Sequence, residues 1–107
     1  MNPKSIKEPI LLYLKELKPK LEKEGITEIG LFGSFAKDEA TIYSDIDIFI
    51  KTTNEFRKKH LGFAGFGFLE DLRQDIAKHF NKEVDLCNIA GFNDERKAKF
   101  LKGAIYV

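Results

Sequence analysis

The chain has 107 residues, of which 43% are hydrophobic and ten are phenylalanines, and this content favours a single packed domain over residues 1–107 and argues against intrinsic disorder. Its 18 basic and 17 acidic residues nearly cancel, so the chain lacks the positive field typical of nucleic-acid binders, and we expect no direct nucleic-acid binding. One cysteine, Cys87, excludes an internal disulfide, and no apolar run resembles a signal peptide or a membrane span, so we expect a cytoplasmic protein without membrane contacts.

The first predicted element is an amphipathic helix from Ser5 to Lys23, in which apolar residues recur every three or four positions. Ser5 and Glu8 have the spacing of a capping box at its start. Pro9 and Pro19 each remove a backbone donor, which leaves open a later start and a kink or an end near Pro19.

Two strands are predicted next, over residues 26–32 and 44–51, with a short helix over residues 34–39 between them. Residues 52–67 have no regular period, and we expect a mobile or partner-dependent segment there. The mixture of glycine and phenylalanine at residues 61–68 fits core filling plus a loop, whereas exposed aromatic side chains there would mark a partner surface.

The rest of the chain is predicted to form a helix over residues 68–80, a third strand over residues 83–89, a helix over residues 93–102 and an apolar tail. The last helix has Asn93 or Asp94 as its predicted cap. This order of elements predicts an α/β (α+β) fold with a small mixed β-sheet of about three strands covered by helices.

Two carboxylates interrupt the apolar second strand. Asp45 and Asp47 are two residues apart, so on a strand both side chains leave the same face and can converge on a divalent cation. Without a cation, repulsion between them would raise the pKa of one. Asp85 interrupts the third strand in the same way. If the two strands are neighbours, the three carboxylates form a cluster that could hold two metal ions.

Gly33 and Ser34 lie where the first strand turns into the short helix. Backbone N–H groups point outward at such a turn, glycine allows a phosphate to approach the backbone, and serine adds a hydroxyl donor. The pair therefore has the character of a phosphate-binding turn.

The pattern Gly33-Ser34, ten residues, Asp45-x-Asp47 resembles the signature of the polymerase-beta-type nucleotidyltransferase superfamily. Over residues 5–105 the chain is most similar to its minimal nucleotidyltransferases. The resemblance implies a nucleotidyltransferase fold and Mg²⁺-dependent transfer of AMP from ATP. It also implies that Gly33 and Ser34 bind the triphosphate and that Asp45 and Asp47 hold Mg²⁺, while Asp85 completes a site for two ions and helps to deprotonate the attacking hydroxyl.

The same resemblance gives Lys37 a nucleotide-binding role, because the family often has a basic residue there. Asp38 stands where a glycine is common, and aspartate tolerates a left-handed turn better than most residues. Tyr43 is close enough in sequence to the predicted site to be a candidate for stacking on a base, beside a purely structural role.

Many minimal nucleotidyltransferases act as the antitoxin of a HEPN-type protein, a helical ribonuclease toxin, by attaching AMP to one of its tyrosines. The resemblance therefore implies a HEPN-type toxin as partner and acceptor. A protein acceptor also fits a chain of 107 residues, which we expect to have no separate domain for holding one. Two alternatives stay open: a non-catalytic antitoxin that neutralises its partner by contact, and a nucleotidyltransferase subunit acting on a small molecule or an RNA end.

Overall fold

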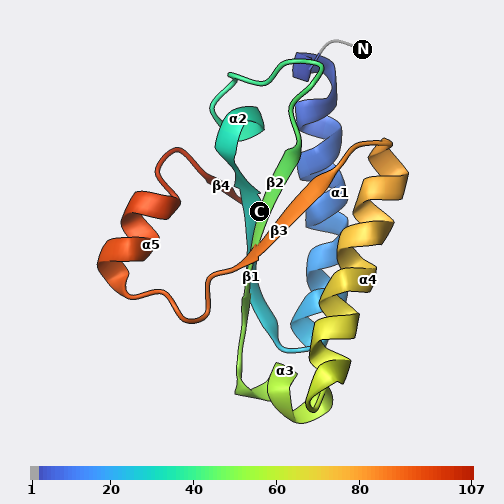
Figure 1. Cartoon of the computed structure of the whole chain (residues 1–107), viewed down its shortest axis with the longest axis vertical. Helices are drawn as coiled ribbons and strands as arrows, with labels where there is room; N and C mark the ends of the chain where they lie inside the picture. The colour runs from blue at the N-terminus through green and yellow to red at the C-terminus, as the bar shows by residue number, and fades with distance from the viewer. Residues whose placement is uncertain (1–2) are drawn as a thin grey trace.

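A computed structural model describes residues 3–107, which form a four-stranded mixed sheet with helices on both faces (Figure 1). The strand order is β3-β2-β1-β4. Strand β1 is antiparallel to both of its neighbours, and β2 and β3 are parallel. In chain order the elements are α1 (Pro3–Lys23), β1 (Ile26–Phe32), α2 (Gly33–Ala36), β2 (Ile46–Thr52), α3 (Asn54–Lys59), α4 (Phe63–Phe80), β3 (Val84–Asn88), α5 (Asp94–Phe100) and β4 (Ile105–Tyr106). This confirms the α+β fold class.

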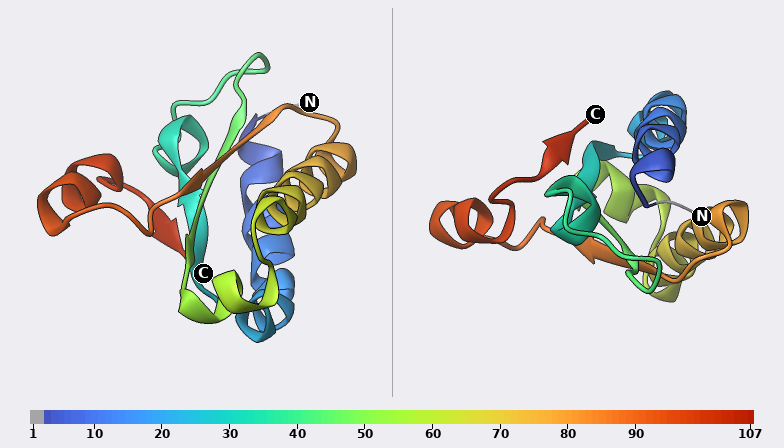
Figure 2. Two further views of the ribbon diagram at one scale, coloured as in Figure 1. Left: turned by 60° about the horizontal axis from the view of Figure 1, so that its bottom comes forward. Right: turned by 90° about the horizontal axis from the view of Figure 1, so that it is seen from above.

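The main core lies between the sheet and the two long helices, α1 and α4, which cover the same face, whereas α5 lies on the other face (Figure 2). Alternation along β2 explains the arrangement, because Ile46, Ile48 and Ile50 are fully buried under these helices. Residues of β2 between them point to the opposite face, toward α5. Asp47, which is expected to bind a cation, therefore lies on a strand that is anchored in the core.

Helix α1 runs without interruption from Pro3 to Lys23, so it neither starts later than Ser5 nor ends near Pro19. Pro9 and Pro19 lie on the exposed side of the helix. Each costs about 3 kcal/mol in a helix interior. Each of the four buried apolar residues on the other side contributes about 1.5–3 kcal/mol, and together they outweigh that cost. Ser5 lies inside the first turn of α1, so the prediction that it caps the start of the helix is wrong.

The sheet has one strand more than the three or so predicted, because the apolar tail contains β4. This strand pairs Ile105 and Tyr106 with β1, and the amide of Val107 donates to the carbonyl oxygen of Ile29 at 3.0 Å. A strand of two residues is too short to show a period of two in the sequence. The second strand begins at Ile46 rather than at residue 44, which leaves Asp45 in the preceding loop.

Residues 52–67, in which the sequence has no regular period, contain the end of β2, helix α3 and the first turn of α4. That this segment is mobile or partner-dependent stays a prediction. The rings of Phe56 and Phe68 pack edge to face at 5.6 Å, with the His60 ring against both. Thr53 ties this segment to the turn after α1 through two hydrogen bonds to the carbonyl oxygen of Gly25. Because two helices with different buried faces follow closely, no single period is visible in the sequence.

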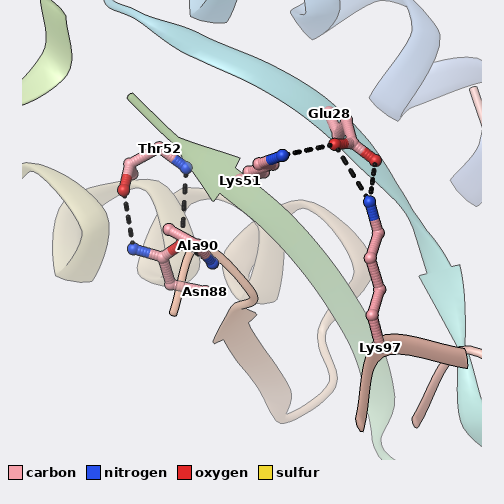
Figure 3. Close-up of polar contacts among 6 residues, drawn as sticks. All are labelled: Glu28, Lys51, Thr52, Asn88, Ala90 and Lys97. Carbon is pink, nitrogen blue, oxygen red and sulfur yellow. Dashed lines mark hydrogen bonds and ion pairs between the residues drawn. The ribbon is translucent and has the colours of Figure 1, made fainter. Parts of the chain in front are cut away.

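Side-chain hydrogen bonds hold the ends of the strands together (Figure 3). Asn88 accepts from the backbone amides of Thr52 and Ala90 and donates to the Thr52 hydroxyl at 2.9 Å, which links β3 to the end of β2. The start of α5 is capped as predicted, with the Asn93 side chain accepting from the Arg96 amide at 2.8 Å. Along the described part of the chain, no helix combines the length and the apolar character needed to cross a membrane.

Candidate active site

Three strands bring predicted site residues together at one end of the sheet. Phe32, the last residue of β1, is the antiparallel partner of Asp47, and Asp85 of β3 is its parallel partner on the other side. Gly33 follows Phe32 directly. The expectation that the strands carrying Asp47 and Asp85 are neighbours is therefore confirmed, and both carboxylates lie beside the turn that carries Gly33.

Gly33 is in direct contact with the Asp47 carboxylate. A Cβ atom at position 33 would lie 2.2 Å from Oδ2 of Asp47, far inside van der Waals contact. The backbone of Gly33 also has φ +72°, in the left-handed region that glycine adopts most readily. The turn therefore needs glycine for two reasons, and one of them is the carboxylate itself.

Asp47 is an unusually basic carboxylate, with its pKa raised to about 6. Partial burial is the largest cause, followed by the negative charge of Asp85 and a hydrogen bond with it, and then by the charge of Asp45. This is the raised pKa that the sequence predicts for clustered carboxylates. It also indicates a local excess of negative charge that a bound cation would relieve.

Asp45 lies in the loop before β2 and is exposed, so it does not share the strand face with Asp47 as predicted. Its charge nevertheless reaches Asp47. Within residues 3–107 there is no group of three or more His, Cys, Asp or Glu side chains arranged so that it could hold a metal ion. The structure thus brings two carboxylates together as strand partners, with the third nearby in a loop.

Ser34 is the second residue of α2, which is a single turn ending at Ala36. The carbonyl oxygen of Ser34 accepts from the Glu39 amide at 2.8 Å, and that of Gly33 accepts from the Lys37 amide at 3.1 Å. The turn is thus closed by its own backbone. Ser34 is half-buried beside Gly33, at the end of the sheet where the carboxylates lie.

Lys37 lies just after this turn and is exposed, with its aliphatic chain against Gly103. Asp38 follows with φ +60°, so it does adopt the left-handed conformation for which aspartate is suited. The side chain of Lys7, which sequence reasoning missed, contacts Asp38 at 2.9 Å and donates to the carbonyl oxygen of Ala36 at 3.4 Å. Helix α1 therefore holds the loop after the Gly33 turn, a role for which the sequence around Lys7 offers no signal.

Arg73 of α4 is a second residue that sequence reasoning missed. It is paired with Glu70 and donates to the carbonyl oxygen of Val84 at 3.5 Å, one residue before Asp85. The pKa of Arg73 is raised, mainly by the hydrogen bond to Glu70 and in a smaller part by the charge of Asp85. The positive charge of Arg73 therefore lies close enough to interact with Asp85. Only the packing of α4 against β3 reveals this neighbour.

The oxygen ligands at this end of the sheet fit a hard divalent cation. Mg²⁺ is commonly bound by one or two carboxylates together with water and substrate phosphates. Asp47 and Asp85 are the two carboxylates that the strand register places side by side. The pKa of Asp47 is raised first by burial and then by the negative charge of Asp85, and such an ion would neutralise this charge.

Comparison with known proteins agrees with this geometry. The family described as "Nucleotidyltransferase domain" matches residues 13–107, which is most of the chain and includes every residue of the candidate site. No curated protein and no solved structure gives a significant match. A mixed sheet with Gly33 against Asp47 and with Asp85 on the next strand is consistent with the nucleotidyltransferase fold. The chain therefore belongs to the nucleotidyltransferase-domain family, and its general activity is nucleotidyl transfer.

Proposed function

We propose that this protein transfers AMP from ATP to a hydroxyl group of a partner protein, in a Mg²⁺-dependent reaction in the cytoplasm. The acceptor in this proposal is a tyrosine of a HEPN-type ribonuclease toxin, and the transfer makes the chain an antitoxin. Family membership supports the nucleotidyl transfer. The acceptor and the antitoxin role rest on the resemblance to minimal nucleotidyltransferases.

The observation that carries the proposal is the contact of the Gly33 turn with Asp47, together with the pairing of Asp47 with Asp85 on the next strand. A triphosphate bound at Gly33 and Ser34 would have its phosphates beside both carboxylates. The Gly33 Cα offers no side chain to exclude it, and Lys37 supplies a nearby positive charge. Catalysis of phosphoryl transfer depends mainly on such positioning and on neutralising the charge that develops on the phosphate oxygens.

In this proposal Asp45, Asp47 and Asp85 hold Mg²⁺, with two ions when the nucleotide is bound. Mg²⁺ would supply neutralisation of the triphosphate charge and polarisation of its oxygens. The loop position of Asp45 allows it to complete the site when phosphate oxygens are present, whereas Asp47 and Asp85 are held in place by strand pairing.

The proposed reaction is an in-line displacement at the α-phosphorus of ATP. The acceptor hydroxyl oxygen forms a bond to this phosphorus, the bond to the oxygen that leads to the β-phosphate breaks, and pyrophosphate leaves. The hydroxyl proton passes to Asp85, which is exposed and lies next to Asp47. The products are the adenylylated acceptor and pyrophosphate.

Incubation with ATP labelled at the α-phosphate tests the proposal, with a HEPN-type protein as acceptor and ATP labelled at the γ-phosphate as a parallel sample. Only the α-label should appear on the acceptor, and only with Mg²⁺. The double variant Asp45→Asn with Asp47→Asn should lose the labelling, whereas Asp71→Asn, on an exposed face of α4, should keep it.

Three results would contradict the proposal. Equal labelling by the double variant would show that the carboxylates are not needed. Full neutralisation of the toxin by the double variant, without label, would favour a binding antitoxin. Labelling of RNA ends or small hydroxyl compounds in place of the protein would assign the transfer to a different acceptor.

A further inference from the structure

Large apolar side chains are exposed where α3 leads into α4. The exposed fraction is 75% for Leu61, 95% for Phe63 and 74% for Phe66. We call these three residues the apolar ridge. Figure 1 places α3 and the start of α4 at the end of the molecule opposite α2, so the ridge is far from the candidate active site. Isolated exposed apolar residues are common, but three within six positions mark an interaction surface.

The exposure is not a sign of a poorly packed segment, because neighbouring aromatic residues of the same stretch are packed well. Phe56 is buried, and its ring contacts the rings of Phe68 and His60 at 5.6 and 4.8 Å. His60 also contacts Glu24 of the turn after α1 at 2.8 Å. The phenylalanines therefore divide into two sets: one closes the core under α3 and α4, and the other faces solvent from a fixed position.

Gly67 lies beside the ridge, one helical turn after Phe63. It is in the interior of α4, where glycine is disfavoured. A Cβ at this position would meet nothing within 4 Å, so no contact inside the protein requires glycine here. Gly65, in contrast, faces the carbonyl oxygen of His60 at 3.1 Å from its would-be Cβ, so the fold explains it. A bare helix surface at Gly67 allows another molecule to approach the backbone closely.

A pocket of about 270 Å³ adjoins the ridge between α4 and β3. Phe66, Leu69 and Leu86 form its apolar part, and Glu70, Arg73 and Asn88 lie at its polar part. The volume is below the range of about 300–1,000 Å³ usual for small-molecule sites. It suits one large apolar side chain of a partner, which is how buried anchor residues bind at protein interfaces.

Three consecutive basic residues, Arg57, Lys58 and Lys59, flank the ridge on α3, and all are exposed. Among the described residues, only Lys58 has a carboxylate within ion-pair distance, Glu55 at 3.6 Å, and that pair is itself largely exposed. Arg57 donates to the side-chain oxygen of Asn54 and Lys59 to the carbonyl oxygen of Lys23, so both keep a positive charge that no carboxylate neutralises. The surface therefore combines an apolar centre with a positive border, and its electrostatic complement is an apolar segment with acidic neighbours.

We propose that the apolar ridge and the adjoining pocket are a docking surface for an acidic amphipathic helix of a partner protein. Its apolar face would cover Phe63 and Phe66 and insert one side chain into the pocket, while its acidic residues face Arg57, Lys58 and Lys59. A second copy of this chain fits less well, because it brings the same positive border. An anionic membrane fits less well too, since a flat surface leaves the pocket unfilled.

The docking does not depend on the proposed transfer reaction, so the two can fail separately. The probe is a synthetic fluorescent peptide that forms an amphipathic helix, with leucine and phenylalanine on one face and glutamate on the other. A peptide with lysine in place of every glutamate is the charge control. Fluorescence anisotropy without nucleotide should show saturable binding of the acidic peptide to the full chain and much weaker binding of the basic one.

The double variant Phe63→Ser with Phe66→Ser should weaken this binding by at least about tenfold. The matched control is Leu12→Ser, which removes a leucine of 58% exposure from α1, far from the ridge, and should leave binding unchanged. Lys58→Glu with Lys59→Glu should weaken binding and make it less dependent on salt. The ridge variants should unfold at the same urea concentration as the wild type, which separates lost docking from lost folding.

Four outcomes would overturn the proposal: equal binding of the acidic and basic peptides, no effect of the ridge variant, association of the wild type alone with anionic vesicles, or a dimer in sedimentation that the ridge variant abolishes. The last two would assign the surface to a membrane or to a second copy. Absence of nucleotidyl transfer would not affect the result, because binding is measured without ATP.

Discussion

The Asp47 carboxylate occupies the space that any side chain at position 33 would need, so a backbone position and a catalytic candidate constrain each other. Gly33 has a matched counterpart in Gly62, which also has positive φ but has nothing within 4 Å of a would-be Cβ. The two glycines therefore separate the cost of a left-handed backbone from the cost of displacing Asp47.

Gly33→Ala should reduce nucleotidyl transfer strongly and destabilise the fold more than Gly62→Ala does. Both variants strain a left-handed backbone, which costs about 1–2 kcal/mol. Only Gly33→Ala also pushes the Asp47 carboxylate out of place. Urea unfolding gives the stability difference, and Mg²⁺-dependent ATP binding gives the effect on the site. Equal losses in both assays for the two variants would mean that the contact has no role.

The raised pKa of Asp47 predicts a pH dependence of stability. The pKa is about 6 in the folded state and near 3.8 when unfolded, so between these values the folded protein binds more protons. Stability from this group should therefore fall as the pH rises from about 4 to 6, because the clustered charge forms. In Asp47→Asn, which cannot ionise, this loss should be absent.

Without Mg²⁺ at pH 7, Asp47→Asn should then be more stable than the wild type by about 1–2 kcal/mol, allowing for solvent screening of a partly exposed group. Urea unfolding of both proteins in a chelating buffer from pH 4 to 8 measures the difference. A constant difference across this range would show that Asp47 titrates normally.

At the level of elements, α5 is held against the sheet by charge and by aromatic contact. Lys97 donates to both carboxylate oxygens of Glu28 at 3.1 and 3.3 Å, and Lys51 contacts the same carboxylate at 3.4 Å (Figure 3). Although partial burial acts to raise it, the pKa of Glu28 is lowered by the two lysines. Phe100 packs on Phe32 with ring centroids 4.7 Å apart, directly before the Gly33 turn.

Lys97→Ala should loosen α5 and leave the rest of the fold intact. The expected loss of stability is at most about 1 kcal/mol, because the pair is partly exposed. Amide hydrogen exchange should accelerate over residues 94–100. Lys99→Ala, which removes an exposed pair with Glu95 on the same helix, is the control and should change exchange little. Similar exchange in both variants would assign the anchoring of α5 to the aromatic contact alone.

At the level of the whole molecule, the candidate site exists only in the folded chain, since Gly33 comes from the turn after β1, Asp47 from β2 and Asp85 from β3. Any ligand that binds there is therefore linked to global stability. Mg²⁺ at about 100 times its dissociation constant should stabilise the protein by about 2.7 kcal/mol. Asp85→Asn should reduce this stabilisation, whereas Asp71→Asn should keep it. Thermal unfolding with and without Mg²⁺ and ATP measures the effect, and an unchanged Mg²⁺ response in Asp85→Asn would remove that residue from the site.

Much of this protein is determined by local sequence. The stripe of α1, the alternation in β2, the Asn93 cap and the spacing from Gly33 to Asp47 can all be read without a structure, because helix and strand geometry fix which residues share a face. The same local rules misjudged Pro9 and Pro19, because burial of the opposite side of α1 outweighs the cost of the prolines. They also gave no indication of β4, which exists only as a partner of β1.

Only the tertiary structure decided how distant segments meet. Pairing of β2 with β3 places Asp85 next to Asp47, the Gly33 turn closes on the Asp47 carboxylate, and Lys97 reaches Glu28 across 69 positions. The same holds for the phenylalanines of residues 61–68, of which Phe68 packs inward while Phe63 and Phe66 face solvent. The physical reason is that a residue's type and period determine what it can do, whereas its neighbours depend on which surfaces the whole chain buries together.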